Sequence, residues 1–174
     1  MSQLRLFVGY LVIMFFWFIA TSIWSVWFVF RDPKFDYRLL AIAALTPDLI
    51  DGISGRVGPL HSVITSIAVL FAIMIATAGR RPIRQRLLAI PIGMFIHLIY
   101  DLAFTDTKMF WWPVTGTSID QKLLLSVERG PWNLPLEIIG ITGCIIAWRY
   151  FSLSDRTRRR LFFRMGQLKH DGNI

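Results

Sequence analysis

The chain alternates between long apolar segments and short polar ones. Five apolar segments follow one another along the sequence, at residues 6–30, 39–53, 57–78, 87–104 and 133–153. The first holds no charged residue, and it is longer than the roughly 20 apolar residues that a helix needs to cross about 30 Å of hydrocarbon. The pattern therefore predicts an all-α fold, namely a multi-pass transmembrane helical bundle with about five membrane segments.

The second segment, residues 39–53, is the shortest of the five. As a helix it would cover only about 22 Å, which is less than the hydrocarbon thickness. Within it Thr46 precedes Pro47; a residue before proline avoids the helical region, and threonine is a fair helix cap. We therefore expect this second helix to be short or broken. Interrupted helices at membrane depth line cavities, which directs attention to Asp48 and Asp51 just beyond the proline.

Composition supports this interpretation. The chain is 55% hydrophobic, and its mean hydropathy is +0.54, which is too apolar for an ordinary soluble domain. A cleaved secretory signal explains the first segment less well, because the apolar part of a signal spans only about 7–15 residues. The single cysteine, Cys144, has no partner for an intrachain disulfide and is interpreted as a packing residue.

The basic residues indicate an orientation in the membrane. There are 19 Lys and Arg residues against 11 Asp and Glu, and the arginines gather at the ends of apolar segments, which speaks against nucleic acid as a partner. The arginine-rich loop 79–86 and the tail 156–169 are both expected to be cytoplasmic. This places the C-terminus in the cytoplasm and the N-terminus outside.

We expect two regions. Residues 1–154 form the membrane domain, and residues 155–174 form a basic amphipathic cytoplasmic tail in which hydrophobic residues are interleaved with arginines. Alternatively, the tail is a plain cluster of positive charges that stops the transfer of the chain across the membrane. This explains its basic residues equally well.

Carboxylates and imidazoles lie inside the apolar segments. Such groups cost several kcal/mol in hydrocarbon unless they are paired, bound to metal or exposed to a wet cavity, so they mark a functional site. Residues three or four apart share one face of a helix, so each of two pairs can direct two ligands to one spot. The predicted metal ligands are Asp48, Asp51, His61, His97 and Asp101.

Two imidazoles with up to three carboxylates form a nitrogen and oxygen ligand set. It suits a divalent metal ion, with zinc as our first expectation and manganese, iron or magnesium as alternatives. Such an ion activates water as a nucleophile, and Asp48 or Asp51, when not bound to metal, is the predicted general base. A covalent nucleophile is then not required.

Three further residues are expected either to support the ligands from behind or to contact the substrate. Glu137 is a ligand, a partner of a ligand histidine or a neutral carboxyl, and these three interpretations stay open. Ser62 follows His61 directly, and Arg56 lies on the same side as the acids, where arginine suits an anionic head group. A purely structural alternative also stands, in which the pair at 97 and 101 is a buried hydrogen-bonded pair.

Several short motifs support a resemblance. The chain carries Pro-Asp-Leu-Ile-Asp at 47–51, Leu-His-Ser at 60–62 and His-Leu-Ile-Tyr-Asp at 97–101, followed by Trp-Trp-Pro at 111–113. In order and spacing they resemble the YdjM-type family of bacterial inner-membrane proteins predicted to be metal-dependent hydrolases. The resemblance implies the ligand set given above. It also implies a divergent member, because Gly52 stands where the family has a histidine.

These observations predict a membrane-embedded metal-dependent hydrolase in the bacterial plasma membrane. The expected substrate is an ester or phosphoester of a lipid or head group, so membrane lipids are the expected partners. The alternative is a non-enzymatic membrane protein in which the same acid and histidine cluster forms a proton, ion or solute path, or only specifies helix packing in a structural subunit.

Overall fold

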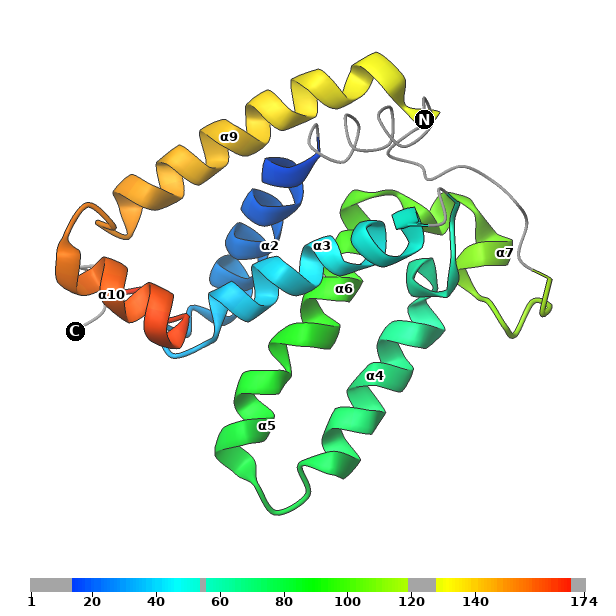
Figure 1. Cartoon of the computed structure of the whole chain (residues 1–174), viewed down its shortest axis with the longest axis horizontal. Coiled ribbons are helices and arrows are strands. Elements are labelled where there is room, and N and C mark those ends of the chain that lie inside the picture. Colours follow the sequence, from blue (N-terminus) through cyan, green and yellow to red (C-terminus); the bar gives the residue numbers. More distant parts are fainter. Residues whose placement is uncertain (1–13, 54–55, 119–127, 170–174) are drawn as a thin grey trace.

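The computed structural model describes residues 14–53, 56–118 and 128–169 of the 174-residue chain. All regular elements in these ranges are helical (Figure 1), so the predicted all-α fold is confirmed. The α-helices are α2 (Phe15–Phe30), α3 (Tyr37–Ile53), α4 (Val63–Ala76), α5 (Arg81–Leu87), α6 (Ala89–Tyr100), α7 (Thr107–Phe110), α9 (Asn133–Tyr150) and α10 (Arg156–Met165). Three short 3-10 turns cover Pro59–His61, Ala103–Thr105 and Gly130–Trp132.

The prediction of membrane spans is wrong for these helices. The helices α2, α4 and α6 have 16, 14 and 12 residues, which correspond to about 24, 21 and 18 Å, against about 30 Å of hydrocarbon. Helix α9 reaches 18 residues, but it contains Glu137 and Arg149. Over the described ranges, no helix combines the length and the apolar composition that crossing a membrane requires.

This finding also corrects the predictions that depended on the spans. The multi-pass topology and the bacterial plasma-membrane localisation are not supported by helices of this kind. The N-terminal part of the first predicted span, at residues 6–13, lies outside the described residues, as does the end of the predicted tail at 170–174.

The predicted break in the second segment is also absent, because α3 continues through Pro47. Proline removes the amide that would bond to the carbonyl of Ala43 and costs a helix about 3 kcal/mol or more. The neighbouring Thr46 hydroxyl donates to the carbonyl of Ile42 at 3.0 Å. Helix α3 packs against both α2 and α6, and this tertiary packing offsets the cost of the proline.

A close contact between α3 and α6 sets the geometry of the centre of the molecule. A Cβ atom at Gly93 of α6 would lie 2.6 Å from the carbonyl oxygen of Leu40 and 2.8 Å from the Cβ of Ala43. Only glycine fits at such a distance from a backbone. Because α6 approaches α3 this closely, residues on the two helices can share one small buried site.

The remaining helices surround this pair. Helices α4 and α5–α6 project together to one side of α3, whereas α9 runs along the opposite side of the molecule next to α2 (Figure 1). The main hydrophobic core lies where α2, α3 and the end of α9 meet. There the rings of Trp27 and Phe151 pack edge to face with centroids 4.7 Å apart, and Tyr37 is fully buried.

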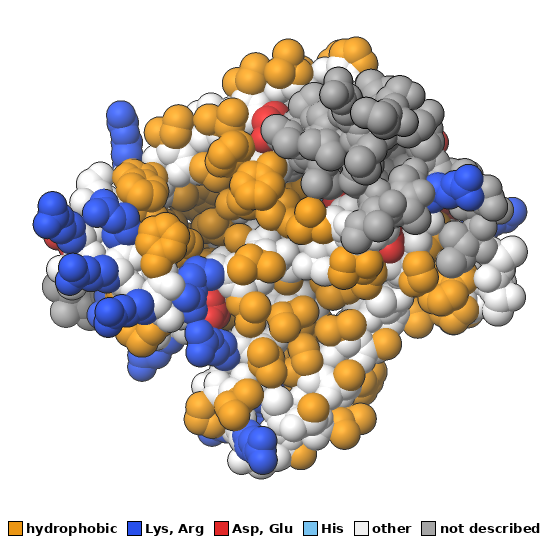
Figure 2. Space-filling view, viewed as in Figure 1, with side chains coloured by type: hydrophobic (Ala, Val, Ile, Leu, Met, Phe, Trp, Pro, Cys, Tyr) orange, Lys and Arg blue, Asp and Glu red, His pale blue; other side chains and the backbone are white. Residues whose placement is uncertain are grey.

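A buried carboxylate fixes the start of α3. Asp36 is 3% exposed and accepts hydrogen bonds from Arg86 Nε at 2.8 Å, Arg38 Nη2 at 3.2 Å and the amide of Leu39 at 3.1 Å. A guanidinium nitrogen of Arg38 also donates to the carbonyl of Phe163 in α10. Figure 2 shows Lys and Arg side chains gathered at this end of the molecule. The carboxylate therefore ties α3, α5 and α10 together.

We predict that Gly93→Ala destabilises the protein by about 1–3 kcal/mol, because the new methyl group overpacks the contact with α3. In an open helix the same change would stabilise by about 0.5–1 kcal/mol. Urea unfolding measures the difference. The matched control is Gly143→Ala in α9, where the new Cβ would lie 3.0 Å from the Ala20 Cβ and would have only side-chain atoms as its nearest neighbours, so its effect should be smaller. A more stable Gly93→Ala variant would contradict the close packing.

A second prediction concerns pH. Burial by itself raises the pKa of Asp36, but the hydrogen bonds from Arg86 and Arg38 outweigh burial and hold this pKa below its ordinary value of 3.8. The ionised carboxylate therefore contributes stability above pH 3.8, and this contribution is lost as the pH falls through the lower folded-state pKa.

Asp36→Asn should accordingly lower the free energy of unfolding by about 1–3 kcal/mol at pH 6, and the deficit should shrink below pH 3.8. Unfolding curves of both proteins between pH 6 and pH 3 provide the measurement. The exposed Asp32→Asn serves as the control and should cost little at any pH. A deficit that stays constant down to pH 3 would exclude this ionic role.

Candidate metal centre

A buried polar cluster lies where α3, the turn before α4 and the end of α6 meet. Asp48 comes from α3, His61 from the Pro59–His61 turn, His97 from α6, and Asp101 is the residue that ends α6. All four are at most 3% exposed. One possible ligand atom from each lies within 4.8 Å of the others. These four side chains therefore form a group that could hold a metal ion, as the sequence predicted, although the kind of ion is not fixed.

His97 is held in one tautomer. Its Nδ1 lies 2.7 Å from the carbonyl oxygen of Ala44, and because a carbonyl only accepts, Nδ1 carries the proton. The ring of Phe18 packs on the imidazole with centroids 4.2 Å apart. Complete burial lowers the pKa of His97 to about 4, so the ring is neutral near pH 7. Its Nε2 consequently presents a lone pair to the cluster.

His61, in contrast to His97, carries a proton on both ring nitrogens. Its Nδ1 lies 2.7 Å from Asp51 Oδ2, and its Nε2 lies 3.2 Å from Asp48 Oδ1. Burial alone lowers the pKa of an imidazole, but the two carboxylates outweigh it and raise the pKa of His61 to about 10. Without a metal, His61 is an imidazolium that donates one hydrogen bond to each aspartate. A metal ligated by Nε2 would take the place of that proton.

The two carboxylates of the cluster differ in their surroundings. Burial raises the pKa of Asp48, but the neighbouring imidazoles outweigh burial and bring this pKa below its ordinary value. Burial and the charge of Asp48 raise the pKa of Asp101 to about 7, although Arg129 opposes both. Arg129 Nη2 donates to Asp101 Oδ1 at 2.6 Å, and its side chain is 19% exposed. A cation between the two carboxylates would relieve their repulsion.

Two atoms without a hydrogen-bond partner test whether a metal fits here. Both Nε2 of His97 and Oδ2 of Asp101 are buried and accept no hydrogen bond. A buried acceptor without a donor costs about 1–3 kcal/mol, so such atoms require an explanation. The Nε2 of His97 lies 3.6 Å from Asp48 Oδ1, and the Nε2 of His61 lies 3.9 Å from Asp101 Oδ2. A divalent ion shared by the four side chains would satisfy both orphaned atoms.

Asp51, also a predicted ligand, is not among the four side chains of the cluster and instead contacts one of them, His61. Its Oδ2 accepts hydrogen bonds from His61 Nδ1 and from the amide of Gly58 at 3.0 Å. A Cβ atom at Gly58 would lie 2.5 Å from Asp51 Oδ1, so the loop needs glycine there. The carboxylate fixes the orientation of the His61 ring, as carboxylates behind ligand histidines commonly do.

The other predicted site residues of this region, Ser62 and Arg56, are not among the four side chains of the cluster. The Ser62 hydroxyl accepts from the amide of Ile64 at 3.1 Å, which caps α4. It also lies within hydrogen-bond distance of the carbonyls of Phe110 and Trp112, and so fixes the segment around α7 beside the cluster. Arg56 is exposed in the loop between α3 and the turn that carries His61.

Glu137 is placed at the start of α2. Its two carboxylate oxygens accept hydrogen bonds from the amides of Phe16 at 3.0 Å and Trp17 at 3.1 Å. These amides belong to the first turn of α2, where helical amides have no partner within the helix. Burial raises the pKa of Glu137 despite both bonds. The contacts make Glu137 a cap that joins α9 to α2.

The contacts that orient the ligands were not predictable from motifs. The carbonyl of Ala44 and the ring of Phe18 carry no chemical signature, yet they fix His97. Arg129 belongs to none of the motifs, and it lies 28 residues from Asp101. No periodicity connects the two positions, because they belong to different elements.

Comparison with protein-family models, with curated proteins and with solved structures finds no match to this chain. The resemblance to the YdjM-type family therefore depends on the motifs alone.

We predict that the purified protein binds one equivalent of Zn²⁺ and that His97→Ala abolishes stoichiometric binding, because the neutral ligand is lost. Asp51→Asn should weaken binding about 10–100-fold, since it changes a group behind a ligand. Competition with a chromophoric chelator measures these affinities. Glu137→Gln lies outside the group and serves as the control with unchanged affinity. Equal affinity in His97→Ala would show that zinc binds elsewhere.

Proposed function

We propose that this protein is a metal-dependent hydrolase that acts on an ester or phosphoester, with a lipid or its head group as the substrate class. The observation that carries the proposal is the neutral His97, whose Nε2 is buried, unpartnered and directed at a carboxylate. A packing residue would have its second nitrogen satisfied. The motif resemblance to the YdjM-type family supports the same chemistry, and membership of a divergent branch is part of this proposal.

Asp48, His61, His97 and Asp101 would hold the ion. Two nitrogens and two carboxylates suit zinc first, and manganese, iron or magnesium next. The ion would polarise the substrate as a Lewis acid and make a water molecule acidic enough to attack at neutral pH.

The protein's own residues would position the reacting groups and move protons. Asp51 holds the Nδ1 side of His61, which leaves Nε2 directed at the cluster. Whichever of Asp48 and Asp51 is not bound to the ion would supply the basic oxygen for proton removal from water. Arg129, which is bound to Asp101 and partly exposed, would attract an anionic phosphoester, because a guanidinium pairs well with phosphate oxygens.

A specific observation favours a second candidate, a metal-free network that only fixes helix packing. His61 already bridges two aspartates, and Arg129 already neutralises Asp101. Such a network would specify how α3 and α6 meet without any catalysis. The two candidates differ in whether the protein holds a metal.

The deciding experiment measures metal content and hydrolysis on the same samples. Wild-type protein loaded with Zn²⁺, Mn²⁺ or Mg²⁺ should hydrolyse bis(p-nitrophenyl) phosphate or p-nitrophenyl octanoate, and His97→Ala should lose metal and activity together. Activity should fall by at least about 100-fold, since the ion provides the nucleophile. Removal of metal by a chelator should have the same effect, and the same metal should restore activity.

Two controls separate the candidates. Glu137→Gln should keep both metal and activity, because its carboxylate caps α2 away from the cluster. Wild-type protein that cannot be loaded with any of these ions would support the packing network instead. Protein that binds metal stoichiometrically without hydrolysing either substrate would retain the metal centre but reject the hydrolase.

A further inference from the structure

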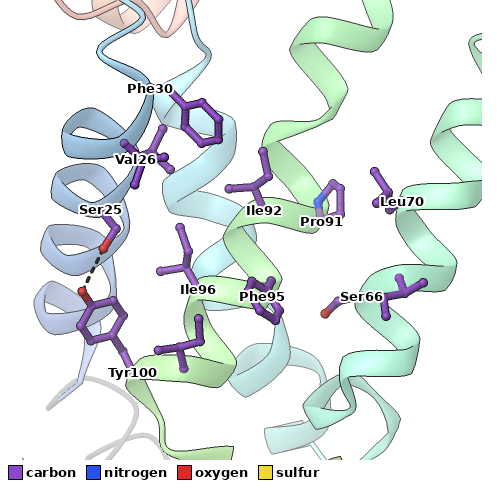
Figure 3. A pocket seen from close by; sticks show the side chains of 13 residues that line it. Ser25, Val26, Phe30, Ser66, Leu70, Pro91, Ile92, Phe95, Ile96 and Tyr100 are labelled. Carbon is purple, nitrogen blue, oxygen red and sulfur yellow. Dashed lines mark hydrogen bonds between the residues drawn. The ribbon is translucent and has the colours of Figure 1, made fainter.

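An apolar groove of about 450 Å³ runs between α2, α6 and α4. Figure 3 shows the side chains that line it, with α6 in the middle, α2 on one side and α4 on the other. Its volume falls within the roughly 300–1,000 Å³ of typical ligand sites. No Lys, Arg, Asp or Glu is among the described residues that line it. The groove therefore suits an uncharged, largely apolar ligand.

The groove is separate from the metal centre. Helix α6 contributes Ile92, Phe95, Ile96 and Ile99 to its wall, and this three- and four-residue spacing defines one face of the helix. His97 falls on the opposite face, towards α3. A ligand in the groove would consequently lie on the face of α6 opposite to the metal ligand His97.

Three hydroxyl groups interrupt the apolar lining, and one of them has no partner. The hydroxyls of Ser25 and Tyr100 bond to each other at 2.9 Å. The hydroxyl of Ser66 in α4 belongs to a residue that is 3% exposed, and it makes no hydrogen bond. In Figure 3 this hydroxyl points from α4 towards the groove and α6. A buried hydroxyl that is left unpaired costs about 1–3 kcal/mol, which a ligand oxygen would relieve.

We propose that this groove binds a single alkyl chain that carries one uncharged oxygen function, as in a long-chain alcohol or ester. The chain lies against the apolar side chains of the three helices, and the oxygen pairs with the hydroxyl of Ser66.

An extended peptide does not fit the same surface. Each peptide residue brings an amide and a carbonyl about every 3.3–3.6 Å, and buried backbone groups need partners. The groove offers one unpaired hydroxyl, because Ser25 and Tyr100 satisfy each other. A charged carboxylate or phosphate would likewise lack a counter-ion among the described lining residues. A chain with one neutral oxygen matches both the lining and the hydroxyl.

The test is calorimetric titration of the protein with 1-decanol in detergent-free buffer. Wild-type protein should bind one equivalent in a saturable manner. Ile96→Trp fills the groove and should abolish binding, whereas Ile138→Trp on the exposed side of α9 should retain it. His97→Ala should also retain binding, so that failure of the metal centre and failure of the groove can be told apart.

Ser66→Ala provides the sharper comparison. It should weaken 1-decanol binding about three- to tenfold, which is the fold-change for the loss of one neutral hydrogen bond. The ligand-free variant should be at least as stable as wild type in urea, because it removes an unpaired buried hydroxyl. If Ile96→Trp does not fold, the comparison of Ser66→Ala with wild type still tests the proposal.

Three results would overturn the proposal. One is the absence of saturable 1-decanol binding to wild-type protein. The second is a Ser66→Ala variant that binds as tightly as wild type while being less stable, which would make Ser66 a structural residue. The third is a wild-type dimer that Ile96→Trp converts to a monomer without any alcohol binding, which would make the groove an interface between copies of this chain.

Discussion

The close packing of α6 on α3 is the constraint on which the candidate site depends. Gly93 allows the backbone of α6 to approach the carbonyl of Leu40, and four residues later His97 reaches the carbonyl of Ala44 at 2.7 Å. That single hydrogen bond fixes the tautomer, and with it the direction of the free nitrogen. A helix pair without glycine at this position would pack further apart, and His97 and Asp48 would then not come close to each other.

Bringing these groups together places three carboxylates in a buried region, where burial and mutual repulsion disfavour their charged forms. Asp48, Asp51 and Asp101 are buried near one another, and His61 and Arg129 supply the positive charges that compensate them. Burial, and after it the charge of Asp48, raise the pKa of Asp101 to about 7. Within the described residues, the three carboxylates beside only two positive groups, together with the orphaned acceptors, make the cluster more suitable for a cation than an ordinary packed interior.

The sequence predicted the helical fold and the ligand-bearing segments because both depend on local patterns. Apolar runs of sufficient length gave helices in every described predicted segment, and the spacing from His97 to Asp101 follows directly from the helical repeat. The sequence did not predict how far each helix extends. The apolar runs 57–78 and 87–104 include residues outside the helices, so α4 and α6 are shorter than the predicted spans. Helix α3 continues through Pro47 because α2 and α6 pack against it.

By itself, the sequence determined which residues are candidates for a functional site, since a carboxylate or imidazole in an apolar segment stands out wherever it lies. Only the tertiary structure decided their roles. It placed Asp48, His61, His97 and Asp101 around one point, moved Asp51 behind His61, and assigned Glu137 to the start of α2. The physical reason is distance along the chain. Periodicity relates residues within one helix, but the contacts that set charge, tautomer and position join residues tens of positions apart.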